Sequence, residues 1–166
     1  MSSEPKRQAP PRCPWSERVR TRIFHWLFVL LRPMTLGVRA VVLDAEHRVL
    51  LVRHGYVVGW HFPGGGVDPG ETCEAAMARE LMEEACVEVL APARLHGLFF
   101  NGRISPRDHV AVYVVENFRV VGVRAPDREI QEARFFDLSD LPKGVTRGTR
   151  ERIAEICGGQ AANGWW

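Results

Sequence analysis

Apolar runs separated by polar turns divide this chain into predicted strands and helices. The runs rich in valine, leucine and phenylalanine predict strands, at residues 37–43, 48–53, 94–100, 109–115 and 133–138. A helix is expected between the second and third of these strands, with Thr72 as its N-cap, and a second helix at residues 149–156. Strands on both sides of one helix, with another helix at the end, predict an α/β fold in which a mixed sheet lies between helices.

The segments before and after this predicted domain have different compositions. Residues 1–14 are rich in proline and polar residues and predict a disordered tail, and residues 158–166 predict a flexible one. Residues 15–33 predict a helix whose apolar stretch, IFHWLFVLL, is far shorter than the ~20 residues that cross a bilayer. Two interpretations stay open for this helix: packing on its own domain or on a second copy in a homodimer, and peripheral contact with a membrane surface.

The predicted helix that follows Thr72 carries three glutamates close together. At about 100° per residue, Glu80, Glu83 and Glu84 fall within an arc of roughly 100°. The opposite side of this helix is apolar, with Ala75, Ala78, Leu81, Met82 and Ala85. The pattern predicts a helix that buries one face and points three carboxylates the other way.

Three carboxylates at this spacing repel one another, and a hard divalent cation would relieve the repulsion. The glycines before the helix let the backbone approach a ligand and can supply a carbonyl oxygen, and Arg79 can hold a carboxylate by two hydrogen bonds. The same spacing also occurs on ordinary solvated helices. A metal site and a solvated helix face are therefore both consistent with the glutamates alone.

The spacing of the residues around these glutamates favours the metal site over the solvated helix face. The spacing G-x5-E-x7-R-E-U-x-E-E-x-G-U, where U is a bulky apolar residue, is matched by Gly65, Glu71, Arg79, Glu80, Leu81, Glu83, Glu84 and Val87. Only the second glycine differs, because Cys86 stands in its place. This stretch, Gly65–Val87, resembles the Nudix box, and the resemblance extends over roughly residues 37–156.

The resemblance implies a fold and an activity. It implies an α/β/α sandwich with the box as a loop–helix–loop, here a domain over residues 34–157. It also implies a hydrolase that uses Mg²⁺ or Mn²⁺ and water to cleave the pyrophosphate bond of a nucleoside diphosphate derivative. A nucleotide sugar, ADP-ribose and a nucleoside triphosphate all remain open as substrates.

Roles for the box residues also follow from the resemblance. The metal ligands would be Glu80, Glu83, Glu84 and the backbone carbonyl of Gly64. Glu83 and Glu84 would act in catalysis, and Arg79 and Glu71 would brace the helix and orient the ligands.

The catalytic base varies among Nudix enzymes. It is a box glutamate in some and a glutamate in a later loop in others. In this chain the segment EIQEARFF resembles that later region, which makes Glu129 the first candidate in the loop and Glu132 the second.

Residues outside the box provide candidates for substrate binding. Arg53 and Arg103 can meet phosphate oxygens, and Trp60 and Phe100 can contact a base or sugar. In strands, aromatic side chains more often belong to the core.

Charge and cysteine usage narrow the cellular setting. The formal net charge of +2 gives no reason to expect a nucleic-acid partner. The four cysteines form no C-x-x-C pair and no zinc spacing, and no secretory signal is evident, so we expect a reducing, cytoplasmic location. Two alternatives to a cytoplasmic enzyme stay open: a non-catalytic Nudix-fold module that binds a nucleotide and regulates a partner, and a membrane-docked hydrolase of a lipid-linked diphosphate.

Overall fold

The structure, a computed structural model, describes residues 33–166. The predicted disordered tail at 1–14 and the predicted apolar helix, apart from Pro33, lie outside the described residues. Within the described part of the chain, none of the helices has the length and apolar character needed to cross a membrane.

Two helices and eight strands follow one another in the described residues. In chain order they are β1 (Thr35–Val42), β2 (Arg48–His54), β3 (Trp60–His61), α2 (Cys73–Ala85), β4 (Val87–Val89), β5 (Arg94–Phe100), β6 (Asp108–Val115), β7 (Phe118–Val120), β8 (Ile130–Asp137) and α3 (Arg147–Gly158). The five strands and the two helices predicted within residues 33–166 are present. The short strands β3, β4 and β7 were not predicted, because two or three residues are too few to show a periodic pattern.

The strands form three small sheets. In the first, β6 lies between β1, to which it is parallel, and β5, to which it is antiparallel. In the second, β2 lies between β3 and β8, both antiparallel to it, and β4 pairs with β7 in the third. The parallel and antiparallel neighbours of β6 confirm the expected mixed sheet.

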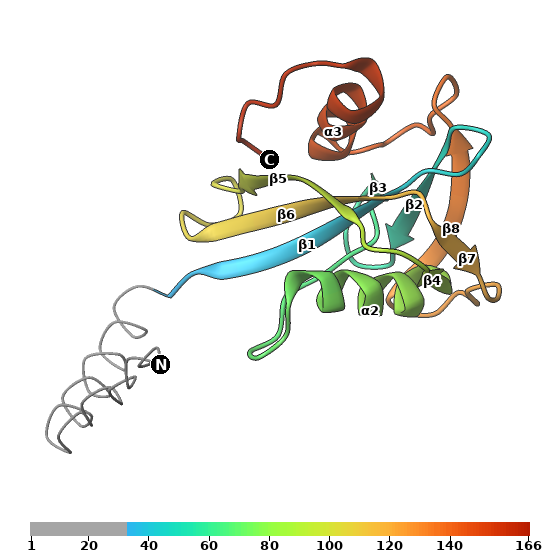
Figure 1. Cartoon of the computed structure of the whole chain (residues 1–166), viewed down its shortest axis with the longest axis horizontal. Coiled ribbons are helices and arrows are strands. Elements are labelled where there is room, and N and C mark those ends of the chain that lie inside the picture. The colour runs from blue at the N-terminus through green and yellow to red at the C-terminus, as the bar shows by residue number, and fades with distance from the viewer. Residues whose placement is uncertain (1–32) are drawn as a thin grey trace, which may run out of the picture. The chain divides into compact units, whose positions relative to one another are not determined.

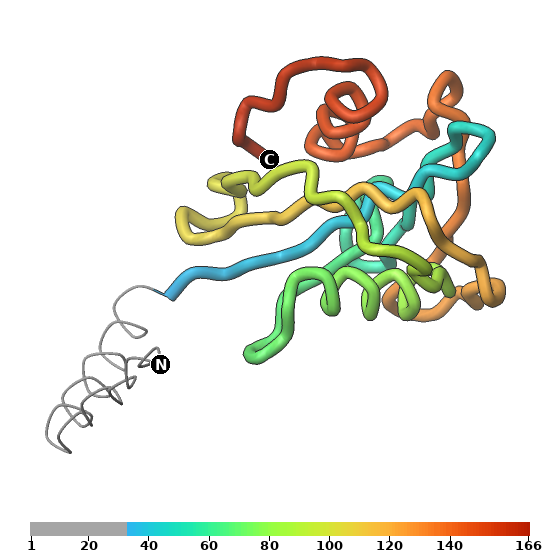
Figure 2. The backbone as a smooth tube through the Cα atoms, viewed as in Figure 1, coloured from blue at the N-terminus to red at the C-terminus, as the bar shows by residue number. Residues whose placement is uncertain are grey.

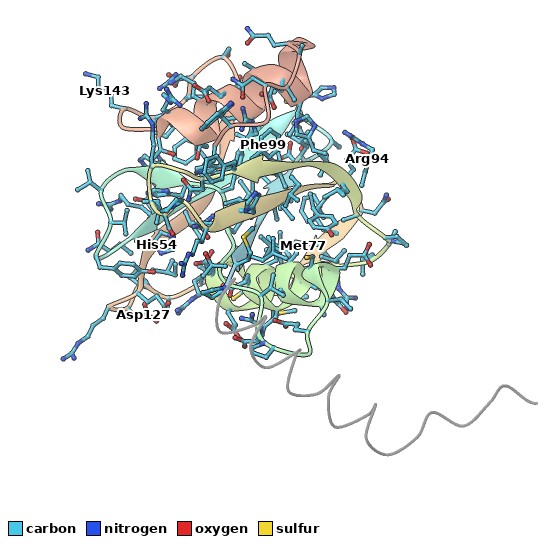
Figure 3. The ribbon with its side chains drawn as sticks, turned by 90° about the vertical axis from the view of Figure 1, so that its left-hand side faces the viewer. His54, Met77, Arg94, Phe99, Asp127 and Lys143 are labelled. Atoms are coloured by element: carbon cyan, nitrogen blue, oxygen red, sulfur yellow. The ribbon has the colours of Figure 1, made fainter. Side chains whose placement is uncertain are left out.

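Two hydrophobic clusters hold the helices against opposite faces of the strands. Along β1, Val38 and Ala40 belong to the cluster under α2, whereas Val41 belongs to the cluster under α3. This alternation follows from the two-residue period of a strand. Figure 1 shows α2 and α3 on the two sides of the strands, and Figure 3 shows Met77 on the α2 side and Phe99 on the α3 side. The α/β/α arrangement is confirmed.

The buried face of α2 differs from the predicted one. Ala75 and Met82, expected on the buried side, are exposed, and Ala76 and Met77 are buried instead. Glu84 is buried beside them, at 6% exposure. The sequence argument set the apolar face opposite the glutamates, but the buried face overlaps the glutamate arc because strand β1 and the preceding loop cover that side of the helix.

Helix α2 begins at the predicted N-cap and ends at a residue in the left-handed conformation. Thr72 accepts a hydrogen bond from the amide of Ala75 at 3.1 Å, which confirms it as the N-cap. At the other end, Cys86 is the C-cap in the left-handed conformation, with φ of 52° and ψ of 43°. This is the conformation that the glycine of the Nudix pattern would adopt most easily.

Replacing Cys86 by glycine should therefore stabilise the domain. The left-handed conformation costs a residue with a side chain about 1–2 kcal/mol, and the extra freedom of glycine in the unfolded chain offsets about 0.5–1 kcal/mol of that gain. We expect Cys86→Gly to raise the free energy of unfolding by about 0.5–1 kcal/mol in urea titrations. A decrease of that size would show that the Cys86 side chain stabilises the helix end by contacts that outweigh its backbone strain.

The last residues are more ordered than the expected flexible tail. Helix α3 ends at Gly158, with Gly159 as a left-handed cap. The chain then returns to the end of β5, where the amide of Trp166 donates to the carbonyl of Phe100 at 3.0 Å (Figure 2). A glycine-rich stretch predicts mobility, but the two tryptophans that follow it give these residues apolar surface to bury.

Candidate active site

The loop before α2 lies along the free edge of β1. The amide of Val38 donates to the carbonyl of Gly65 at 2.8 Å, and the amide of Ala40 donates to the carbonyl of Pro63 at 2.9 Å. Gly64 has a φ of 139°, and a Cβ atom there would lie 2.2 Å from the carbonyl oxygen of Val38. Only glycine can take this position, which brings the loop backbone against β1 and beside the glutamates.

The next glycine makes room for a carboxylate. A Cβ atom on Gly65 would lie 2.4 Å from Oε1 of Glu80. The Glu80 carboxylate therefore occupies the space that any side chain at position 65 would fill. Together with Gly64, this explains in physical terms why two successive glycines precede the helix.

The three box glutamates point into environments of different depth. The exposed fraction of the side chain is 8% for Glu84, 14% for Glu80 and 61% for Glu83. The carboxylates thus form a row from the interior to the solvent. We call Glu80, Glu83 and Glu84 the glutamate row.

Arg79 connects most of the charged groups in the box. Its guanidinium donates two hydrogen bonds of 3.1 Å to Glu71 and one of 2.7 Å to Glu80, and lies 3.5 Å from Glu83. The bonds from Arg79 hold the pKa of Glu71 below its usual range, and the amide of Asp68 adds to this effect. Arg79 supplies part of the positive charge that the sequence argument assigned to a cation.

Glu84 is bound differently, by the backbone of the loop. The amide of Gly64 donates to Oε2 of Glu84 at 2.8 Å. Burial, helped by the negative charges of Glu80 and Glu129, raises the pKa of Glu84 to about 7 against the opposing effects of the Gly64 amide and Arg39. A carboxyl group with this pKa can accept a proton near neutral pH.

Arg39 is a site residue that the sequence reasoning missed. Its Nη1 donates to the carbonyl of Phe62 at 3.0 Å and to the carbonyl of Gly64. Burial lowers the pKa of Arg39, and the charges of Glu84 and Glu80 oppose that shift. The available signal was an arginine inside the apolar strand sequence GVRAVVL, since a charge in a strand core needs a partner.

A buried histidine also lies beside the glutamate row and was missed. Nε2 of His54 is 3.7 Å from Oε1 of Glu84, and the ring lies 5.4 Å from that of Tyr56 and 5.6 Å from that of His61. Burial, with the charge of Arg39, lowers the pKa of His54 to about 4, so the ring is neutral at neutral pH. The apolar run RVLLVRH gave no sign that its last residue meets the box helix.

The two loop candidates for a base lie in different surroundings. Glu129 is exposed in the loop before β8, its carbonyl accepts from the amide of Gly55 at 2.9 Å, and its charge acts on Glu84. Glu132 lies within β8 rather than before it, and forms ion pairs of 3.2 Å with Arg53 and Arg134. Of the two, Glu129 is the one whose charge acts on the glutamate row.

The four proposed substrate-binding residues do not converge on one site but form two pairs, Arg53 with the Trp60 ring 5.7 Å away and Phe100 with Arg103. Trp60 is buried at 7% exposure and packs on Phe136 in the core, which does not place it in a binding cleft. Arg53 pairs with Glu132 beside a cavity of about 330 Å³ that His54 also lines. Phe100 and Arg103 line a separate cavity of about 440 Å³ at the end of β5.

A third cavity reaches the box loop. It has a volume of about 350 Å³, and its lining includes Arg39, Gly65 and Gly66 beside the box together with Asn101 and Trp166. We call it the β1–β6 cleft, because both strands contribute residues to it. It joins the loop beside the glutamate row to the last residues of the chain.

The donors around the glutamate row suit a hard divalent cation in their chemistry. They are carboxylates and a backbone carbonyl, the oxygen ligands that such ions prefer. In the arrangement described for residues 33–166, no three acidic, histidine or cysteine side chains converge to hold an ion. Arg79 and the Gly64 amide occupy the carboxylates, and Arg39 binds the Gly64 carbonyl. The oxygen atoms are of the kind that such an ion binds. On binding it, the carboxylates and the Gly64 carbonyl would give up their present hydrogen bonds and ion pairs.

Comparison with known proteins identifies the family. A sequence model of the NUDIX domain matches residues 33–156, which is more than half of the 166-residue chain. The chain therefore belongs to the Nudix family. The match agrees with the residues of the box and with the α/β/α arrangement around it.

The individual relatives match only part of the chain, at about one third identity. A putative 8-oxo-dGTP diphosphatase of Bacillus subtilis is 34% identical over 76 residues, 46% of this chain and 50% of that protein. An ADP-ribose pyrophosphatase of Methanocaldococcus jannaschii is 33% identical over 107 residues, 61% of this chain and 62% of that protein. The chain thus spans less than two thirds of the length of either of these curated relatives.

A solved structure supports the fold. The MutT NUDIX hydrolase from Burkholderia pseudomallei superposes with a TM-score of 0.60 and is 27% identical, covering 74% of this chain and 97% of that one. The similarity extends over nearly all of that protein.

Proposed function

We propose that this chain is a hydrolase that uses Mg²⁺ or Mn²⁺ to cleave the pyrophosphate bond of a nucleoside diphosphate derivative by attack of water at phosphorus. The observation that carries the proposal is the glutamate row, held on α2 by Arg79 and by the amide of Gly64 next to an open cleft. Relatives named as an ADP-ribose pyrophosphatase and a putative 8-oxo-dGTP diphosphatase support a substrate of this class.

The residues of the chain divide the work in this proposal. Glu80, Glu83, Glu84 and the carbonyl of Gly64 would hold the cation, which when bound neutralises pyrophosphate oxygens and makes phosphorus more electrophilic. Arg79 positions the row through its bonds to Glu80 and Glu83. Its bonds to Glu71 fix the guanidinium in turn.

The attacking water needs a group that takes its proton. Glu84 is the first candidate for this role, because its carboxylate is buried in the glutamate row and is oriented by the Gly64 amide. Glu129 is the second candidate, since its exposed carboxylate is near enough to influence Glu84. Arg39 lines the β1–β6 cleft beside Gly64, and there it would neutralise the negative charge of the substrate phosphates.

The direct test is an activity panel with the purified full chain. ADP-ribose, a UDP-sugar, dGTP and 8-oxo-dGTP would be incubated with Mg²⁺ or Mn²⁺, and release of phosphate-containing products measured. We expect turnover of at least one compound with metal and none in EDTA. Binding of these nucleotides without any turnover would instead identify the non-catalytic module.

A cytoplasmic setting is part of the proposal. The described cysteines, Cys73, Cys86 and Cys157, are all free thiols, as a reducing compartment would keep them.

Divalent metal should also stabilise the folded chain. A ligand at about 100 times its Kd stabilises the folded state by about 2.7 kcal/mol, so 1 mM Mg²⁺ should add about 1–3 kcal/mol if its Kd is about 10–200 µM. The measurement is the thermal midpoint with MgCl₂ against the same ionic strength of NaCl. Equal midpoints with Mg²⁺, Mn²⁺ and NaCl would argue against an ion among these glutamates.

A further inference from the structure

The last three residues form a defined strap against β5. The amide of Phe100 donates to the carbonyl of Gly164 at 2.9 Å, and the amide of Trp166 donates back to the carbonyl of Phe100 at 3.0 Å. Trp165 lies opposite Phe100 in a parallel bridge, with the two rings 5.2 Å apart. Residues Gly164–Trp166, called the strap below, thus extend the sheet by a short parallel segment (Figure 2).

A buried arginine holds the strap from below. Arg152 of α3 has no exposed surface, and its Nη1 donates to the carbonyl of Trp165 at 2.7 Å. Its Nη2 pairs with Glu155 at 2.5 Å, and the other oxygen of Glu155 lies 2.9 Å from Nε2 of His96. Burying a charge is unfavourable unless it is paired and hydrogen-bonded, so this network indicates a strap built for a fixed position.

The fixed position places Trp166 in the wall of the β1–β6 cleft. Its ring packs between Phe99, 6.4 Å away, and Gly148 of α3, where an added Cβ would lie 2.9 Å from the ring. The cleft runs from this indole to Arg39 and Gly65, next to the glutamate row. The indole of Trp166 and the guanidinium of Arg39 therefore line the same cleft.

Polar groups lie on the same cleft and are themselves oriented. Asp108 accepts from Nδ2 of Asn101 at 2.7 Å and from Oγ1 of Thr35 at 2.6 Å. With its amide nitrogen directed to Asp108, Asn101 makes no hydrogen bond through Oδ1 to any described residue. That oxygen is an acceptor for a ligand in the cleft.

We infer that Trp166 is a substrate-binding residue that stacks on the planar base of the substrate, with the strap and Arg152 holding it in place. The inference rests on the proposed function and deepens it, because it assigns the β1–β6 cleft to the base of a nucleotide whose phosphates lie at Arg39 and Gly65. Stacking of a base on an aromatic side chain is tolerant of base identity. Asn101 supplies the hydrogen-bonding group that can prefer one base edge.

The first experiment measures binding without relying on turnover. AMP, GMP, CMP and UMP would be titrated into the full chain by calorimetry, with ribose 5-phosphate as the base-free control. We expect at least one nucleotide to bind about tenfold or more tighter than ribose 5-phosphate, which corresponds to about 1.4 kcal/mol. In Trp166→Ala this preference should fall below about threefold, and Trp166→Phe should keep most of it. Trp165→Ala is the matched control, because Trp165 lines only the neighbouring cavity, whereas Trp166 lines both that cavity and this cleft.

A second variant acts on the ring of Trp166 without removing it. Gly148 is in α3 with an ordinary negative φ, so alanine suits the helix, but its Cβ would lie 2.9 Å from the indole and displace it. Gly148→Ala should therefore weaken nucleotide binding and leave binding of ribose 5-phosphate unchanged. Combined with Trp166→Ala, it should have no further effect. Melting curves of each variant establish that the domain is folded.

The outcomes separate this inference from the proposed function. A base preference that depends on Trp166, in a chain that hydrolyses none of the compounds of the activity panel, would remove the hydrolase proposal and support the base subsite. Turnover with an unchanged base preference in Trp166→Ala would remove the base subsite alone. The inference is also overturned if the wild-type chain does not distinguish nucleotides from ribose 5-phosphate, or if Trp165→Ala has the larger effect.

Discussion

Replacing Glu84 by glutamine should lower kcat by about 100-fold or more, because the change removes a cation ligand and a base candidate together. The amide of glutamine can still accept the hydrogen bond that the Gly64 amide now donates to Oε2 at 2.8 Å. The variant therefore keeps its shape and loses only the charge. Glu83→Gln should lower kcat in the same way. Because the Glu83 side chain is 61% exposed, this substitution should not unfold the domain, so a loss of activity would reflect the site itself.

The control for these variants is Glu74→Gln. Glu74 is an exposed carboxylate in the first turn of the same helix, so its replacement changes the net charge equally and should leave kcat within about twofold. The comparison of Glu129→Gln with Glu132→Gln then tests the loop candidates. Glu132 forms ion pairs with Arg53 and Arg134, so Glu132→Gln should lower kcat less than Glu129→Gln. Wild-type kcat in both Glu83→Gln and Glu84→Gln would refute the assignment of the glutamate row.

Most of the fold could be predicted because it depends on local patterns. Runs of valine and leucine between turn residues located the longer strands, and Thr72 located the start of α2. Strand β8 begins at Ile130, three residues before the predicted start, because the polar residues that alternate along it resemble a loop. Its position is fixed instead by pairing with β2, which sequence periodicity does not reveal.

The site was predicted only as far as the box extends. The spacing of Glu80, Glu83 and Glu84 is a property of one helix, so it could be recognised without the fold. Arg39 and His54 come from two different strands and meet the box only after the chain has folded. Trp166 is still further from the box in sequence, and reaches the same cleft only because the strap returns to β5.

The depth of Glu84 explains why the buried side of α2 was predicted incorrectly. A helical projection assigns polar residues to the solvent, and the remaining residues to the core. Here the Gly64 amide satisfies a buried carboxylate, so the helix can turn Glu84 toward the strands. The same burial gives Glu84 its raised pKa, and this has a consequence for stability.

In EDTA, the stability of the wild-type chain relative to Glu84→Gln should decrease as the pH rises from about 4.5 to 7. Burial raises the pKa of Glu84 from 4.5 to about 7, so in this interval the unfolded carboxyl loses its proton while the folded one keeps it. The unfolded state then binds fewer protons, and stability falls with pH. The full difference is at most about 3 kcal/mol, at 1.36 kcal/mol for each unit of pKa.

The comparison with Glu84→Gln is needed because His54 acts in the opposite direction. Its pKa is lowered to about 4, chiefly by burial, so it contributes stability that increases as the pH rises from 4 to 6.5. Because Nε2 of His54 lies only 3.7 Å from Oε1 of Glu84, the two groups can couple, and the comparison is repeated with His54→Asn in both proteins to remove the histidine contribution. Urea titrations from pH 4 to 8 should show curves that coincide near pH 4 and separate by pH 7. Added Mg²⁺ should stabilise the wild type and reduce its difference in free energy of unfolding from Glu84→Gln, since a cation favours the ionised carboxylate. If that difference instead stays constant within about 0.5 kcal/mol over this pH range, the buried Glu84 carboxyl ionises as it does in water.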